Sequence, residues 1–491
     1  MKSILKYSIL LVILFIGGCS KDEWMNPSPK TSLSDLSVFD TKDRIIAQVN
    51  GMYASLKHGQ HLGGRFLVYN DIRDDNFIPN SNNGVTNYQT WNHTVINSTN
   101  EVQNLWGQIY TTINVVNVFL QGLTDAWYAG GKVTTFLSQA EYNQYRSEAL
   151  AIRAICYFDL MQMYSKPYGI NNGASQGVPL RLEANKSAAG NDLAPATVAE
   201  VYAQILSDLD EAEPMATLTF GDDESNIIRI HRNTIIAYKT RVYMHMRNWA
   251  KVVSESAKIV SSSAPFTAGT GVANALNSTY AGVFASPHST SENIFSLPNT
   301  TADNPGTQNY LSHYFNNASG ESYYLNTASA AFTALNATDA RRTMMRTVSG
   351  KTYIQKYTDN ANRTDYSPVI RYAEVLLNRA EAIVRQGNAV TQEAVDLLNA
   401  VRTRSYPAGA YTIASFADAE ALNNAILLER NIEFLGEGIR NMDLMRLGLT
   451  IPGKDGGSMG NIAEIPSTSP TYYWPVPASE LSYNKLMTPN N

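Results

Sequence analysis

Apolar residues recur at helical spacing along most of the chain. In the first such stretch, Ile45, Val49, Met52, Tyr53 and Leu56 fall at i, i+4, i+7, i+8 and i+11, which is one face of a helix. The same criterion predicts helices at about 41–58, 101–122, 141–165, 197–213, 233–262, 369–404 and 416–436. Paired helices with small alanines at their crossings are typical of tetratricopeptide-like repeats, which must stack to bury their apolar faces. We therefore predict a mainly α, helical-repeat scaffold.

Two long segments have no helical period. Residues 59–100 and 261–365 are polar and rich in Asn, Ser, Thr, Gly and Tyr. We interpret them as a large, variable, loop-rich region attached to the helical scaffold, in one domain that spans 41–491. Binding residues are concentrated on surface loops held by a rigid framework, so these two segments are the predicted ligand-binding region.

The N-terminus is typical of an exported protein. A basic start is followed by the apolar run 7–16, which is shorter than the roughly 20 residues of a membrane-spanning helix. This pattern predicts a signal peptide at 1–18. Gly17 and Gly18 precede Cys19 as in the bacterial lipobox, so we predict a lipid on Cys19 and a lipidated tether at 19–40.

The residues after Cys19 bear on location. Lys21, Asp22 and Glu23 resemble the surface-export signal of Bacteroidetes lipoproteins, although a solvated linker would have the same composition. The expected location is the outer membrane, anchored by lipid and facing the exterior. Once Cys19 is acylated, Cys156 is the only thiol left, so no intramolecular disulfide can form.

Charge and motif content argue against several functions. A net charge of −5 over 491 residues provides no basic face for nucleic acid. The seven His residues are scattered without metal-ligand spacing, so no metal site is expected. Asp71, Asp74 and Asp75 surround Arg73, and salt bridges at the base of a loop are favoured there over glycosidase acids or a calcium site. The charged series at 429–446 is interpreted as a structural ion-pair network, with many i,i+3 or i,i+4 partners.

Several motifs carry a family resemblance. They run in order along the chain at 147–160 (SEALAIRAICYFDL), 197–209 (TVAEVYAQILSDL), 370–382 (IRYAEVLLNRAEA), 429–438 (ERNIEFLGEG) and 474–477 (WPVP). With these motifs the chain resembles the SusD/RagB family of nutrient-binding outer-membrane lipoproteins. The resemblance implies four tetratricopeptide-like units, no cofactor and no covalent chemistry. It also implies a SusC-like TonB-dependent transporter as partner, with the ligand held at the face between the two proteins.

Ligand contacts are expected from aromatic and amide side chains of the two loop segments. Rings would stack on sugar faces, while amides and Arg would bond to hydroxyl groups. The candidate residues are Arg73, Asn87, Tyr88, Trp91, Asn92, Tyr280, Tyr310, Tyr314, Tyr323 and Tyr324. In an extended segment, the tandem Tyr323 and Tyr324 would place one ring outward, because side chains alternate.

Four functions remain open from the sequence. The leading hypothesis is capture of oligosaccharides for the transporter, without catalysis. The first alternative keeps that role but changes the cargo to peptides or glycoprotein fragments. The others are a surface glycosidase that uses Asp71 and Asp75, and a helical scaffold that binds a partner protein and no small ligand.

Overall fold

The structure is a computed structural model that describes residues 38–83, 87–128, 133–187, 190–317 and 319–490. The predicted signal peptide 1–18, the lipidation site Cys19 and the export signal 21–23 lie outside the described residues. So does the predicted tether 19–40, apart from its last three residues. Among the described helices, none is long and apolar enough to cross a bilayer.

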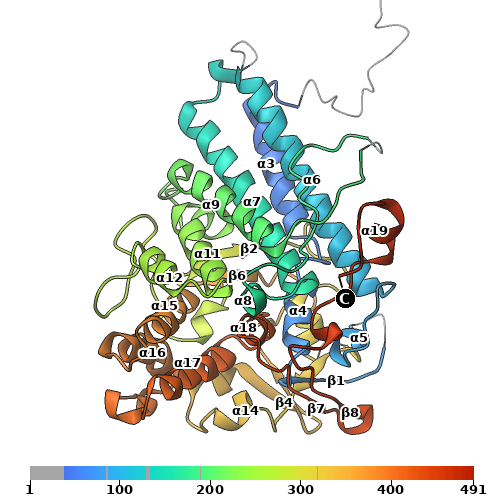
Figure 1. The fold of residues 1–491 in the computed structure, drawn as a ribbon. Helices are drawn as coiled ribbons and strands as arrows, with labels where there is room; N and C mark the ends of the chain where they lie inside the picture. The colour runs from blue at the N-terminus through green and yellow to red at the C-terminus, as the bar shows by residue number, and fades with distance from the viewer. Residues whose placement is uncertain (1–37, 84–86, 129–132, 188–189, 318, 491) are drawn as a thin grey trace, which may run out of the picture.

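Long helices form most of the molecule, which confirms the mainly α prediction (Figure 1). Each packs against its neighbours in turn, from α3 through α6, α7, α9 and α11 to α12 and α15. Helix pairs α11–α12 and α15–α16 are also in contact, and α17 packs on α15. These helices are α3 (Lys42–Leu56), α6 (Asn100–Tyr128), α7 (Gln139–Tyr164), α9 (Val198–Met215), α11 (Arg232–His245), α12 (Trp249–Ser256), α15 (Tyr372–Gly387), α16 (Gln392–Ser405) and α17 (Ala419–Glu433).

Local sequence sets where α7 and α9 begin. Thr197 accepts a hydrogen bond from the Glu200 amide at 3.2 Å, and the Glu200 carboxylate accepts one from the Thr197 amide at 2.8 Å. This is the capping box, and Ser138 and Glu141 form the same arrangement at the start of α7. Each cap contributes about 1 kcal/mol by satisfying amides that have no partner within the helix.

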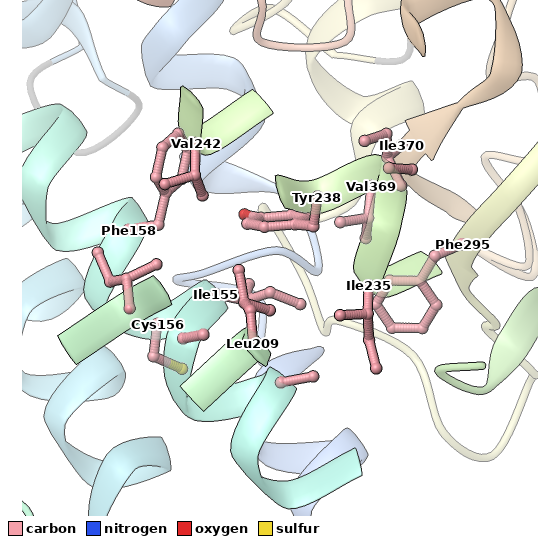
Figure 2. Packing of buried hydrophobic residues seen from close by; sticks show 14 of the residues in the cluster. Ile155, Cys156, Phe158, Leu209, Ile235, Tyr238, Val242, Phe295, Val369 and Ile370 are labelled. Atoms are coloured by element: carbon pink, nitrogen blue, oxygen red, sulfur yellow. The ribbon is translucent and has the colours of Figure 1, made fainter. Parts of the chain in front are cut away.

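The main core lies where three helices meet a short sheet. Figure 2 shows Ile155 and Phe158 of α7, Tyr238 of α11, Phe295 and Ile370 as members of one buried cluster. Phe295 belongs to β2 (Asn293–Leu297) and Ile370 to β6 (Ser367–Arg371), which pair antiparallel. The predicted helix at 369–404 was therefore wrong at its start, because residues up to Arg371 form a strand.

Cys156 is a buried free thiol in this core, and burial raises its pKa well above the usual value.

The two segments predicted as loops contain more structure than their periodicity indicated. The first contains α4, a helix whose eight residues are all buried, so no amphipathic period marks it. Three further small sheets, β1–β3, β4–β5 and β7–β8, lie at the same end of the molecule. The remaining elements are α4 (Arg65–Ile72), β1 (Phe77–Pro79), α5 (Tyr88–Trp91), α8 (Tyr168–Asn171), α10 (Ser225–Ile228), α13 (Leu311–Phe315), β3 (Tyr323–Leu325), α14 (Ala330–Ala334), β4 (Met345–Val348), β5 (Lys351–Ile354), α18 (Arg440–Arg446), β7 (Lys454–Asp455), β8 (Asn461–Ile462) and α19 (Ala478–Tyr483).

The charged series at 429–446 forms the predicted ion-pair network, but mostly with partners on other elements. Arg371 of β6 pairs with Glu433 at 3.2 Å and with Glu437 at 2.7 Å. Glu433 also pairs with Arg341 and Arg404. Although burial alone would raise the pKa of the Glu433 carboxyl, Arg404, Arg371 and Arg341 lower it to about 2. The network ties the C-terminal helices to the strand and loop segments that precede them.

Candidate ligand-binding site

Burial divides the ten predicted ligand residues into two groups. Six side chains lie in the core, namely Arg73, Asn87, Trp91, Tyr280, Tyr314 and Tyr323. Four are half-exposed, namely Tyr88, Asn92, Tyr310 and Tyr324. Only the second group presents side-chain surface to a ligand in this structure.

Trp91 is the clearest correction. Its side chain is 0% exposed, and its indole N–H donates to the carbonyl oxygen of Phe77 at 2.7 Å. The Tyr88 ring stacks on one side at 5.6 Å between centroids, and the Lys454 ammonium lies 5.1 Å from the indole. Trp91 is thus a core residue beneath the surface and not a stacking platform for ligand.

The other buried candidates are also committed to the protein itself. The Arg73 guanidinium donates to the carbonyl of Tyr472 at 2.9 Å. The Tyr280 hydroxyl donates to the carbonyl of Glu433 at 2.9 Å, and the Tyr314 hydroxyl to that of Gln308 at 2.6 Å. The expectation that these side chains bind ligand is wrong for this structure, because their polar atoms serve backbone carbonyls inside the core. Asn87 is buried in a left-handed conformation just before α5.

The carboxylates near Arg73 do not form the salt bridges expected from the sequence. Asp71 accepts a hydrogen bond from the Gly438 amide at 2.8 Å, and Asp74 accepts one from the Asn76 amide at 2.7 Å. Burial, and then the neighbouring Asp75, raise the pKa of Asp74 to about 7. A glycosidase acid must reach the sugar, and Asp71, at 1% exposed, cannot do so here. Across the described residues, no cluster of His, Cys, Asp or Glu could hold a metal ion.

The strongest candidate contact is Tyr324. The register of β1 and β3 places Ile78 opposite Tyr324 and Pro79 opposite Tyr323. Tyr323 points into the core while Tyr324 is half-exposed, as the alternation of an extended strand predicts. The Tyr324 ring therefore lies at the margin of a second apolar cluster, which includes the buried side chains of Phe77 and Tyr323.

Polar groups surround the Tyr324 ring. The Lys351 ammonium lies 4.6 Å from the ring centroid and donates to the Asn80 amide oxygen at 2.8 Å. Burial, and then the charges of Tyr353 and Asp455, raise the pKa of the Tyr324 hydroxyl. We refer to Asn80, Tyr324, Lys351 and Asp455 as the Tyr324 surface.

This arrangement suits a neutral, polyhydroxylated ligand. A flat ring covers the apolar C–H face of a sugar, while an ammonium, an amide and a carboxylate supply donors and acceptors for its hydroxyl groups. A few placed polar groups around an apolar contact are what orient small ligands in general. Tyr88 packs at the margin of the same apolar cluster as Tyr324.

Tyr310 forms a separate half-exposed group. The Arg363 guanidinium lies 5.2 Å from its ring centroid, and the His313 ring meets it edge-on at 5.4 Å. Asn92 accepts a hydrogen bond from the Thr94 amide at 3.2 Å and so is partly used in its own turn. Tyr310 and Asn92 are both partly exposed to solvent. Each has fewer polar neighbours that could bind a ligand than Tyr324 has.

The sequence reasoning missed Asn80, Lys351 and Asp455. A signal for Lys351 was present, because Ser349 and Gly350 link β4 to β5 as a two-residue turn with φ of 50° and 78°. Two successive positive φ angles are typical of the tight hairpin turns that match strand twist. Reading 261–365 as irregular concealed this hairpin and the side chains that it presents.

Comparison with known proteins places the fold. A family model described as the SusD family matches residues 284–491, and one described as starch-binding associating with the outer membrane matches residues 23–244. A solved SusD superfamily protein from Bacteroides fragilis is 30% identical, with a TM-score of 0.81 over 92% of this chain and 100% of that one. The chain belongs to the SusD/RagB family.

More distant similarities are found to one solved structure and to one curated sequence. The surface glycan-binding protein A from Bacteroides uniformis is 20% identical, with a TM-score of 0.69 over 92% of this chain and 99% of that one. A SusD-like protein, P38, from Formosa agariphila is 24% identical over 256 residues, which is 51% of this chain and 44% of that protein. The chain thus matches less than half the length of this curated relative.

Proposed function

We propose that this SusD/RagB protein captures oligosaccharides at the cell surface and passes them to a SusC-like TonB-dependent transporter. Family membership supports the role, since one matching family model is described as starch-binding and a relative of the same fold is named as glycan-binding. The single observation that carries the cargo assignment is the Tyr324 surface, where an accessible ring is flanked by an ammonium and an amide.

The protein binds without catalysing in this proposal. Asp71, which a glycosidase reading would require, is buried and holds a backbone amide. Tyr324 is the main stacking residue, with Tyr88, Asn92 and Tyr310 as further contacts. The anchor is the lipid on Cys19, which would hold the binding surface at the outer membrane beside the transporter.

Titration calorimetry against panels of oligosaccharides and peptides tests this proposal. Removing a stacking ring from a binding centre costs about 1–2 kcal/mol, so Tyr324→Ala should weaken binding of one sugar class by about 5- to 30-fold. Tyr128→Ala is the matched control, because Tyr128 is 75% exposed and lies on α6, away from the Tyr324 surface.

Three outcomes are distinguishable. Sugar binding that weakens in Tyr324→Ala and persists in Tyr128→Ala would support the proposal. Binding of peptides with silence across the sugars would replace the cargo with peptides. Silence across both panels would contradict capture of a small ligand and favour a protein-binding scaffold.

A further inference from the structure

A second feature of the surface is a long open cleft that shares no lining residue with the Tyr324 surface. It has a volume of about 1270 Å³ and lies between α6, residues of the stretches 180–187 and 190–193, and α19. Figure 1 shows α19 and α6 on the same side of the molecule, away from β4 and α14. Sites for single small molecules usually occupy about 300–1,000 Å³, so this cleft has room for an oligomeric ligand.

The wall of the cleft is held rigidly by side-chain amides of α6. Asn117 donates to the carbonyl of Arg181 at 2.8 Å, and Asn114 donates to that of Asn185 at 3.0 Å. The Asn185 amide in turn donates to the Asn114 side chain at 2.8 Å. A ligand entering the cleft would therefore meet a surface that is already ordered, which reduces the entropy lost on binding.

The chemistry of the lining favours an uncharged partner. Arg181 and Lys186 balance Glu183 and Glu480, and Arg181 pairs with Glu480 at 3.5 Å. Along the wall, the backbone N–H groups of residues 181–184 donate to no backbone carbonyl of the described residues. Balanced charge with spare donors matches the hydroxyl and ring oxygens of a neutral sugar.

Two further positions suit a ligand that lies along the cleft. The Tyr483 ring at the rim is 81% exposed, so its face is free for stacking. Gly107 lines the cleft from the N-terminal third of α6, and a Cβ built there would meet no atom within 4 Å. Packing within the chain does not require glycine there, although glycine weakens a helix relative to alanine. Its absence of a side chain leaves room for close approach to the helix backbone.

We propose that this cleft is a second binding site for a neutral oligosaccharide, with Tyr483 stacking on a sugar ring and the 181–184 backbone donating to its oxygens. The inference rests on the proposed function, because it assigns another site to the same class of ligand. A chain that contacts glycan at two separated surfaces would hold a long polymer more tightly than either surface alone, by making the second contact intramolecular.

Two variants test the cleft, each with a matched control. Gly107→Trp fills the floor of the cleft, and Gly51→Trp is its control, because Gly51 lies in α3 with open space around a Cβ and does not line the cleft. Tyr483→Ala removes the exposed ring, and Tyr128→Ala removes another highly exposed ring outside the cleft. Circular dichroism and thermal unfolding of every variant establish that the fold is retained.

The readout is titration calorimetry with the oligosaccharide that the wild-type chain binds, together with retardation in gels containing the parent polysaccharide. We expect Gly107→Trp to remove one of two binding sites, and Tyr483→Ala to weaken that site by about tenfold, which is the effect of losing one good contact. In Tyr324→Ala the cleft site should persist. Both controls should match the wild type.

The possible failures are separable. If the wild-type chain binds no oligosaccharide, the proposed function and this inference are both overturned. If the wild type binds and Tyr324→Ala weakens it, but Gly107→Trp and Tyr483→Ala leave stoichiometry and retardation unchanged, only the cleft assignment is overturned. If Gly107→Trp does not fold, Tyr483→Ala alone still decides the matter.

Discussion

Replacing Trp91 should destabilise the protein without directly affecting the ligand. The indole is fully buried, donates to the Phe77 carbonyl at 2.7 Å and contacts both the Tyr88 ring and the Lys454 ammonium. Truncating a buried Trp to Ala costs about 3–5 kcal/mol through lost packing and the cavity left behind. Trp91→Phe keeps most of the apolar contact but loses the hydrogen bond, which is worth about 1 kcal/mol.

Urea denaturation at equilibrium measures the change. The midpoint should fall in the order wild type, Trp91→Phe, Trp91→Ala, with the slope of the unfolding free energy against urea unchanged. Under conditions where Trp91→Phe is fully folded, its Kd for oligosaccharide should stay within about twofold of the wild-type value. Loss of oligosaccharide binding at an unchanged midpoint would refute this reasoning and place Trp91 in the binding surface.

Three further predictions concern the ion network, a buried histidine and the anchor. Glu433→Gln removes a carboxylate that pairs with the buried Arg371, Arg404 and Arg341. It should lower the free energy of unfolding by about 3–5 kcal/mol, measured by thermal or urea unfolding. Exposed Glu420→Gln in the same helix should change stability by less than about 0.5 kcal/mol, and equal effects of the two would contradict the network. Burial lowers the pKa of His231 to about 4, so the imidazole is protonated more readily in the unfolded chain than in the folded protein. Up to about 3 kcal/mol of folding stability should therefore be lost as the pH falls from about 6.5 to 4. Unfolding free energies across that range should slope less in His231→Asn, and an identical slope would contradict the assignment. Cys19→Ala should release the protein from membrane fractions or leave its signal peptide uncleaved, and unchanged membrane association would contradict lipid anchoring.

The helical scaffold could be predicted from the sequence because the residue patterns that mark a helix are local. An amphipathic helix such as α3 places Ile45, Val49, Met52 and Leu56 on one buried face, and that spacing is visible without any knowledge of the partner. The capping box of Thr197 and Glu200 is equally local, and the structure contains it. Periodicity fails where burial is complete, which is why α4 was missed: Arg65–Ile72 has no exposed face.

The candidate site could be predicted only in part, because the solvent exposure of a side chain depends on segments far apart in the chain. Whether Trp91 is a platform or a core residue is decided by Phe77 and Lys454, and nothing near Trp91 in the sequence indicates Lys454. That one of Tyr323 and Tyr324 points outward could be predicted, since strand alternation is local, but which of the two does so depends on the core that buries Tyr323. Its polar neighbours, Lys351 and Asn80, come together only through the pairing of β1, β3 and β5.

The most direct test of the central claim, glycan capture at the Tyr324 surface, is a crystal structure of the protein with the oligosaccharide that it binds in solution. The account predicts a sugar ring stacked on Tyr324, with its hydroxyl groups within hydrogen-bonding distance of Lys351 and Asn80. Sugar bound elsewhere while the Tyr324 surface stays empty would contradict the central claim.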